Sequence, residues 1–225
     1  MTIKAIAFDL DGTIVDSIPD LSNAANHARA HLGMEPLAAK IIESYVGDGA
    51  DVMVARSLAN DMSAVYTGTP QQQEGLAAFD AHYLEHLHVN TRFYEGVEPV
   101  LRALKQRGYP LALVTNKAER YTLPLIERLG ARELFDVVVG GDTLATRKPD
   151  AGPLLHAASQ FGIAPAELLM VGDSKNDALT ARNAGCPVYL VPHGYADPRQ
   201  FDCDRVLRDT AELLELLPVT PASAA

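Results

Sequence analysis

Two aspartates, Asp9 and Asp11, stand one residue apart in the segment FDLDGT, directly after an apolar run. Three more segments with chemically active side chains follow: TNK at 115–117, KP at 148–149 and GDSKND at 172–177. By itself, an Asp-Gly pair after an apolar run indicates a turn. Paired carboxylates together with a hydroxyl and an ammonium group could instead form a reaction centre.

The pattern of the chain from about residue 95 predicts the elements that position these segments. Helical spacing in GVEPVLRALKQRG, AGPLLHAASQFG and NDALTARNAG alternates with strand-length apolar runs in LALV, FDVVV, ELLMV and CPVYLV. Such alternation indicates βαβ units and a parallel sheet that is covered on both faces. We therefore predict an α/β fold with a doubly wound, mostly parallel sheet.

Residues 16–92 differ, because every segment in this part has helical character and none is a convincing strand. We expect an all-helical cap at 16–92, inserted into an α/β core formed by 1–15 and 93–225. The insert follows the first predicted strand, so it should rise from the carboxyl edge of the sheet. Ligands of open α/β sheets bind at that edge.

The carboxyl ends of parallel strands lie along one edge, so the four segments should converge there. Each has an ordinary alternative: Asp11-Gly12 as a turn, Thr115 as a helix cap, Lys148 as a surface charge and Asp173 as a loop residue. Crowded carboxylates, however, repel one another and require a cation. Oxygen ligands with retained waters suit Mg²⁺, which also binds substrate phosphate oxygens.

The order DLDGT, strand-end Thr, Lys-Pro and GDSKND resembles the haloacid dehalogenase superfamily of phosphohydrolases. Within it the chain looks most like the bacterial phosphoglycolate phosphatases, on the segments VGDGADVMVARSL, LVTNK, RKPDAGPL and VGDSKND. The resemblance implies a Rossmann-like core with a helical cap, and Mg²⁺-dependent hydrolysis of a small anionic phosphomonoester. The first candidate substrate is 2-phosphoglycolate, which would yield glycolate and phosphate.

The resemblance also implies roles for the acidic residues. Asp9 would be the nucleophile that forms an aspartyl-phosphate, and Asp11 the general acid and base. Mg²⁺ would be held by the Asp9 carboxylate, the Asp11 carbonyl and the Asp173 carboxylate. Asp177 would act indirectly, through water or by orienting Lys148.

Substrate contacts are implied on both sides of the site. Thr115, Lys148 and the backbone N–H of Asn116 would hold the phosphoryl oxygens. Gly12 lets the chain leave the first strand sharply, and we place it beside the substrate.

In the cap, Gly49 would allow the backbone to approach the ligand. Arg56 could bind a substrate carboxylate, or could simply be an exposed helix charge. Asp48 departs from the family pattern, in which this segment reads Gly-Asn-Gly-Ala.

Four other functions stay open at this point: a phosphatase for another small ester, a phosphosugar mutase of the same superfamily, a 2-haloacid dehalogenase and a phospho-accepting receiver module. The mutase would share all four motifs and differ in its cap. The dehalogenase works without metal, so Asp11, Asp173 and Asp177 argue against it. A receiver module is about half as long and has no helical insert.

A net charge of −10 argues against a nucleic-acid or anionic-membrane partner. No signal segment or stretch of about 18 apolar residues occurs, so we expect a cytoplasmic protein. We expect a monomer or a homodimer. The His82–His86 pair, with His88 nearby, has a spacing that could bind a transition metal, although an ordinary helix is the simpler explanation.

Overall fold

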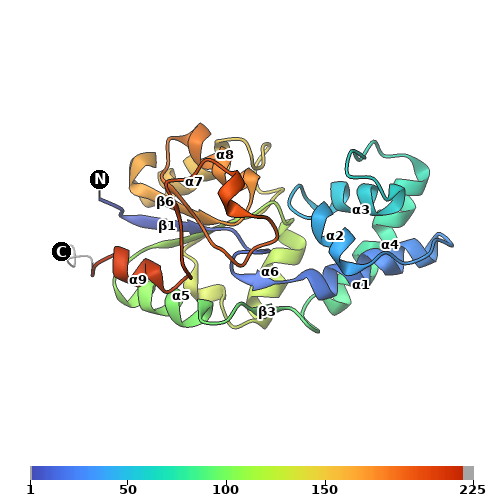
Figure 1. The fold of residues 1–225 in the computed structure, drawn as a ribbon, viewed down its shortest axis with the longest axis horizontal. Helices are drawn as coiled ribbons and strands as arrows, with labels where there is room; N and C mark the ends of the chain where they lie inside the picture. Colours follow the sequence, from blue (N-terminus) through green and yellow to red (C-terminus); the bar gives the residue numbers. More distant parts are fainter. Residues whose placement is uncertain (1, 220–225) are drawn as a thin grey trace.

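A computed structural model of the protein describes residues 2–219. Its centre is a six-stranded sheet in the order β5-β4-β1-β6-β7-β8, in which all neighbouring strands are parallel. The strands are β1 (Ala5–Phe8), β4 (Leu111–Val114), β5 (Val137–Val139), β6 (Leu168–Gly172), β7 (Val188–Leu190) and β8 (Arg205–Val206). The predicted doubly wound α/β fold is therefore confirmed (Figure 1).

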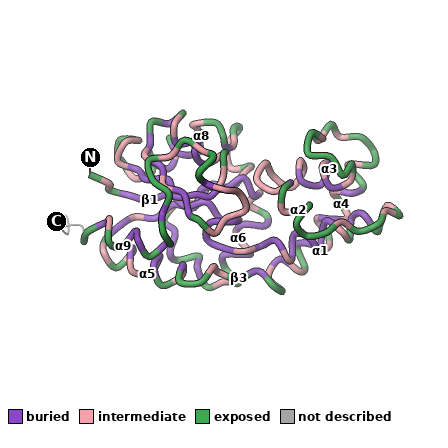
Figure 2. The backbone as a smooth tube through the Cα atoms, in the orientation of Figure 1, coloured by how far each residue is buried: buried purple, intermediate pink, exposed green. Residues whose placement is uncertain are grey.

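Helices cover both faces of the sheet, because alternate residues of each strand point to opposite sides. They are α5 (Val97–Gln106), α6 (Glu119–Arg128), α7 (Gly152–Phe161), α8 (Lys175–Ala184) and α9 (Glu212–Leu216), with short 3-10 helices η1 (Arg132–Leu134), η2 (Pro165–Glu167) and η3 (Pro198–Gln200). Ile6 and Phe8 share a buried cluster with residues of α5 and α6. Ala5 and Ala7 share another with residues of α7 and α8. Figure 2 shows the sheet as the buried centre of this part.

Four helices lie between β2 (Val15–Asp16) and β3 (Arg92–Phe93), to one side of the sheet in Figure 1. They are α1 (Ile18–His31), α2 (Ala39–Tyr45), α3 (Ala50–Ala59) and α4 (Pro70–His86). β2 and β3 form an antiparallel pair at the base of these helices. The sequence pattern missed this pair, because two residues are too few to show a strand period. The predicted boundaries of core and cap stay a prediction.

A hydrogen-bonded carboxylate fixes α1 to the segment that enters β3. Asp20 is buried and accepts the backbone N–H groups of Asn90 and Thr91, both at 2.8 Å. The Thr91 hydroxyl donates to the same carboxylate. The two ends of the helical segment are thus held together near the sheet. No helix within residues 2–219 is long and apolar enough to cross a membrane.

The alanine face of the sheet should tolerate enlargement poorly. Ala7 is fully buried in the cluster beneath α7, whereas Ala59 is exposed at the end of α3. Ala7→Val should lower the free energy of unfolding by about 1–3 kcal/mol, because added methyl groups overpack this layer. Ala59→Val, the matched control, should change it by less than about 0.5 kcal/mol. Urea denaturation measures both, and equal stability of the two variants would contradict this packing.

Candidate active site

Side chains that follow three neighbouring strands meet at the carboxyl edge of the sheet. The Asp9 N–H donates to Val171 at the end of β6, and the Thr115 N–H donates to Val139 of β5. These bonds extend the parallel register by one residue beyond the strands. Asp9, Thr115 and Asp173 consequently line one pocket, whose opposite wall comes from the α1–α4 segment.

Three buried carboxylates, those of Asp9, Asp173 and Asp177, offer oxygen atoms that all lie within 4.8 Å of one another. Burial, reinforced by the charge of Asp177, raises the pKa of Asp9 to about 6, although Lys148 opposes this shift. Burial and the charges of Asp177 and Asp9 raise the pKa of Asp173 to about 8. The cluster therefore stabilises a cation placed among its oxygens, and carboxylate oxygens fit a hard divalent ion.

A single ammonium group serves two of these carboxylates. Lys148 is buried, and its Nζ lies 2.9 Å from Asp9 Oδ1 and 2.7 Å from Asp177 Oδ1. The other oxygen of Asp177 accepts the N–H groups of Asp173 and Ser174, and the Ser174 hydroxyl. Both Asp177 oxygens are thus engaged within the protein, which suits an indirect role through Lys148 better than direct metal binding.

Asp173 is held by neutral donors. Its Oδ1 accepts the Thr13 hydroxyl and its Oδ2 accepts the Tyr195 N–H, each at 2.9 Å. Gly12, at φ +85°, packs against it so closely that a Cβ there would lie 2.5 Å from Asp173 Oδ2. Gly12 thus packs beneath Asp173, and its expected place beside the substrate stays a prediction.

Asp11 faces away from this cluster, toward a second lysine. The Lys117 Nζ lies 3.1 Å from both Asp11 oxygens, and the Ser17 hydroxyl donates to Asp11 Oδ1 at 2.5 Å. Burial opposes the charge of Lys117, but Asp11 outweighs it and raises the pKa of Lys117 above its usual value. Sequence reasoning gave Lys117 no role, although its place in the TNK motif after β4 was a signal.

The Thr115–Asn116 pair presents donors to the pocket. Thr115 Oγ1 accepts the Lys117 N–H, which leaves the hydroxyl proton for another acceptor. The Asn116 N–H has no acceptor among the described residues. The Asn116 side chain donates to the carbonyl groups of Gly47 and Lys148, at 2.8 and 2.9 Å, and so joins the α2–α3 loop to the sheet edge.

The α2–α3 loop lies directly against the core. Gly47 and Gly49 have φ values of +124° and +100°, which favour glycine, and both line the pocket. A Cβ on Gly49 would lie 2.7 Å from Arg147 Nη1, which pairs with Asp51 at 3.2 Å. Asn176 of α8 donates to the Gly47 carbonyl. The backbone at Gly49 thus approaches Arg147 closely, and its expected approach to the ligand stays a prediction.

Arg56 pairs with an acidic side chain of its own segment, and its expected role as a ligand for a substrate carboxylate stays a prediction. Arg56 Nη1 lies 2.7 Å from Asp48 Oδ2 and donates to the Tyr45 carbonyl, and Arg56 does not belong to the described pocket wall. Asp48 also accepts an N–H from Asn176 at 2.8 Å. The carboxylate that departs from the family pattern is therefore engaged within the loop and by the core.

Two histidines of α4 and one of α1 form a stack of rings. His82 stacks between His27 of α1 and His86, with ring centroids 4.4 and 4.2 Å apart. Within residues 2–219, the only three metal-ligating side chains whose ligand atoms converge are the aspartates described above. The simpler explanation, an ordinary helix surface, agrees with this stacking.

Comparisons with known proteins agree with this geometry. The chain is 48% identical to a phosphoglycolate phosphatase of Chromobacterium violaceum over 215 residues, which covers 96% of each chain. It is 43% identical to one of Thiobacillus denitrificans, with 94% of each covered. A crystal structure of a predicted phosphoglycolate phosphatase from Haemophilus somnus 129PT has a TM-score of 0.88 at 32% identity, covering 96% of this chain and 98% of that one. A sequence model of haloacid dehalogenase-like hydrolases matches residues 6–191. With its parallel sheet and the acidic edge described above, the chain belongs to the haloacid dehalogenase-like hydrolase family.

Proposed function

We propose that the protein is a Mg²⁺-dependent phosphomonoester hydrolase whose substrate is 2-phosphoglycolate. The observation that carries this proposal is the buried trio of carboxylates beside Lys148, with Asp11 on the other side of the same strand end. The similarity to phosphoglycolate phosphatases over nearly the whole chain supports the choice of substrate. Cytoplasmic location and a monomeric or homodimeric state stay predictions.

The residues divide the reaction between them. The Asp9 carboxylate attacks phosphorus in line with the leaving oxygen, while Asp11 donates a proton to the departing alkoxide. Thr115, the Asn116 N–H and Lys148 hold the phosphoryl oxygens as charge develops on them. Asp11 then takes a proton from a water molecule that attacks the aspartyl-phosphate, which releases phosphate and restores Asp9.

The acidic edge would hold the metal ion through the Asp9 and Asp173 carboxylates and the Asp11 backbone carbonyl. Asp177 supports this set by fixing Lys148 and the start of α8. When bound, Mg²⁺ supplies positive charge that neutralises the phosphoryl group and Asp9. Lys148 alone cannot do so, because it is shared between Asp9 and Asp177.

Lys117 is the one cationic side chain in the described pocket wall that could bind a second anionic group of the substrate. Its ammonium lies 4.8 Å from the centre of the Tyr83 ring. The Tyr83 hydroxyl is buried and its oxygen is hydrogen-bonded by the Lys117 ammonium, so its own proton can be donated to a ligand oxygen. We therefore assign the glycolate carboxylate to Lys117 and Tyr83, in place of Arg56.

Replacing the nucleophile tests the reaction itself. Asp9→Asn should reduce phosphate release by more than about 10⁴-fold, because an amide cannot form the acyl-phosphate. Circular dichroism should show an unchanged fold. Asp61→Asn, an exposed change in the cap, should retain wild-type activity. Phosphate release is measured with 2-phosphoglycolate and Mg²⁺.

Full activity of Asp9→Asn, or of metal-free wild type, would overturn the mechanism. Transfer of phosphate to a second sugar position without release would indicate a mutase.

Metal binding should depend on pH in a defined direction. The raised pKa values of Asp9 and Asp173, about 6 and 8, mean that the folded metal-free protein holds more protons than the unfolded chain. Its stability should therefore fall as pH rises from about 4 to about 8. Mg²⁺ competes with these protons, so it should raise the melting temperature more at pH 8 than at pH 5.5. Calorimetry measures this difference, and Asp173→Asn should abolish most of it. An equal or larger shift at pH 5.5 would contradict the assignment.

Selectivity for the carboxylate should reside in Lys117. Lys117→Met should lower the preference for 2-phosphoglycolate over ethyl phosphate by about 10-fold or more, the effect of losing about 1.4 kcal/mol of a charged contact. The ratio of kcat/KM values removes any shared effect that Lys117 exerts on Asp11. Arg56→Ala is the comparison variant and should leave this ratio within about twofold. The opposite ranking of the two variants would return the carboxylate to Arg56.

A further inference from the structure

A chain of hydroxyl groups leads from the pocket wall to Asp11. The Ser17 hydroxyl donates to Asp11 Oδ1 at 2.5 Å, and the hydroxyl oxygen of Ser17 lies 3.2 Å from the Tyr195 hydroxyl oxygen. Tyr195 Oη in turn accepts the Ser17 backbone N–H at 3.1 Å. Ser17 is fully buried, and Tyr195 lines the pocket.

The direction of this chain follows from the number of protons. Ser17 has one hydroxyl proton and gives it to Asp11 Oδ1, which leaves Oδ2 as the oxygen that carries the proton Asp11 transfers. The contact between Ser17 Oγ and Tyr195 must then be donated by the phenol. Tyr195 therefore holds the Ser17 side chain through its hydroxyl and, separately, binds the Ser17 backbone N–H.

The loop that carries Tyr195 is tied to the other side of the centre as well. The Tyr195 N–H donates to Asp173 Oδ2, and Gly194 passes so close to Asp173 that a Cβ there would lie 2.1 Å from the Asp173 Cβ. His193 Nε2 lies 3.1 Å from the Thr13 carbonyl, and its ring packs on Tyr94. The phenol thus projects from a well-anchored loop.

Asp11 is subject to two competing contacts. Lys117 approaches both oxygens at equal distance and sets no orientation between them, whereas Ser17 binds only Oδ1. We propose that Tyr195 is a positioning residue that, through Ser17, holds Asp11 oriented for proton transfer to the leaving group. This inference rests on the proposed function, and neither hydroxyl touches the substrate phosphorus in this role.

Leaving groups of different basicity test the proposal. An alkoxide needs a proton from Asp11, whereas nitrophenolate leaves without one. In Tyr195→Phe, kcat/KM with 2-phosphoglycolate should fall about 10–100-fold, a part of the typical contribution of a general acid. With p-nitrophenyl phosphate, kcat/KM should change by less than about twofold, because this ratio reports the first phosphoryl transfer and not the later attack of water, which both esters share. Ser17→Ala should reproduce the same split.

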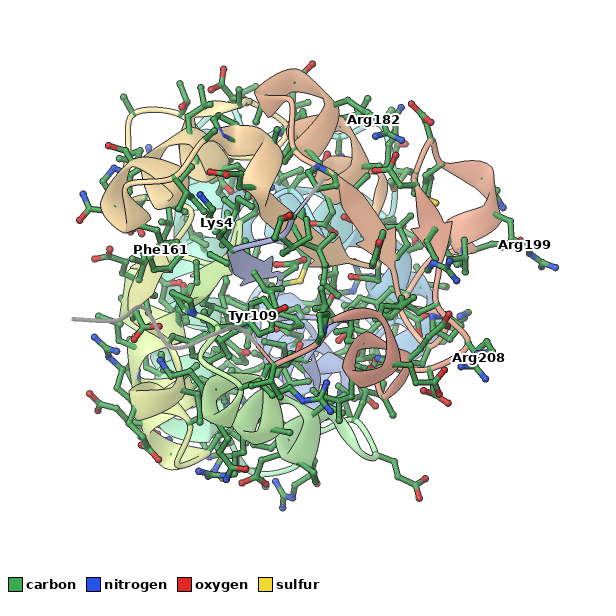
Figure 3. The ribbon with its side chains drawn as sticks, turned by 90° about the vertical axis from the view of Figure 1, so that its left-hand side faces the viewer. Lys4, Tyr109, Phe161, Arg182, Arg199 and Arg208 are labelled. Carbon is green, nitrogen blue, oxygen red and sulfur yellow. The ribbon has the colours of Figure 1, made fainter. Side chains whose placement is uncertain are left out.

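Two further measurements separate positioning from simple damage. The backbone N–H of residue 195 remains in Tyr195→Phe, so the Mg²⁺-induced rise in melting temperature should equal that of the wild type. Tyr109→Phe loses a hydroxyl bond to the Pro218 carbonyl at the far end of the sheet, the end that Figure 3 faces, and should keep both activities. If Tyr195→Phe does not fold, Ser17→Ala decides.

Four outcomes overturn the proposal. Equal losses of kcat/KM with both esters would assign Tyr195 a general structural role, and a lost Mg²⁺ shift would assign it to the metal site. Unchanged kcat/KM with 2-phosphoglycolate would remove any role. Wild-type protein that releases phosphate from neither ester would reject the proposed function itself, and this inference with it, whereas the other outcomes leave that function standing.

Discussion

Repulsion among three buried carboxylates is the constraint on which the rest of this centre depends. Asp9 and Asp173 follow the neighbouring strands β1 and β6, Asp177 lies in the first turn of α8, and burial makes their mutual charge expensive. One ammonium, Lys148, is placed between two of them. The remaining stabilisation comes from neutral donors: the start of α8 beneath Asp177, and a hydroxyl and an N–H on Asp173. The ammonium, hydroxyl and N–H groups around the cluster thus all offset its negative charge.

The pocket depends equally on close backbone approach between distant segments. Gly12, Gly172 and Gly194 each lie where a Cβ would come within 2.5 Å of an aspartate side chain. A Cβ on Gly49 would lie 2.7 Å from Arg147 Nη1 at the junction with the α2–α3 loop. These contacts allow charged groups to be enclosed without intervening side chains. The centre is therefore compact because glycine occupies the positions where the backbone passes closest to charged side chains. It is charged because aspartate follows the strand ends.

The sequence predicts the fold and the acidic edge well, because both follow from short-range patterns. Alternating apolar segments determine a parallel sheet, and a parallel sheet places Asp9, Thr115 and Asp173 at one edge whatever the loops do. Pairing between side chains far apart in sequence follows no such rule. Lys117 could reach Asp11, Tyr83 or solvent, and only the arrangement of α4 above β4 decides. The pairing of Arg56 with Asp48 likewise follows from packing and not from a sequence pattern.

The contact between Ser17 and Tyr195 joins residues 178 positions apart, and no local pattern announces it. The β2–β3 pair was missed because it is too short to show a period. Tertiary packing decides both features. Sequence motifs predict the site residues whose positions the sheet fixes. The residues that orient those side chains come from loops and from the helical segment, where no motif predicts their contacts.

The pairing of Asp48 with Arg56 has a consequence for how such a loop can vary. The two side chains form a neutral unit that is 37% and 12% exposed, and a charge left alone there would be poorly solvated. Replacing one of the two residues leaves the charge of the other unpaired, whereas replacing both removes the two charges together. The effects of the two replacements on the free energy of unfolding are therefore non-additive, and the two positions are energetically coupled. A relative with an amide at the first position is expected to carry a different residue at the second.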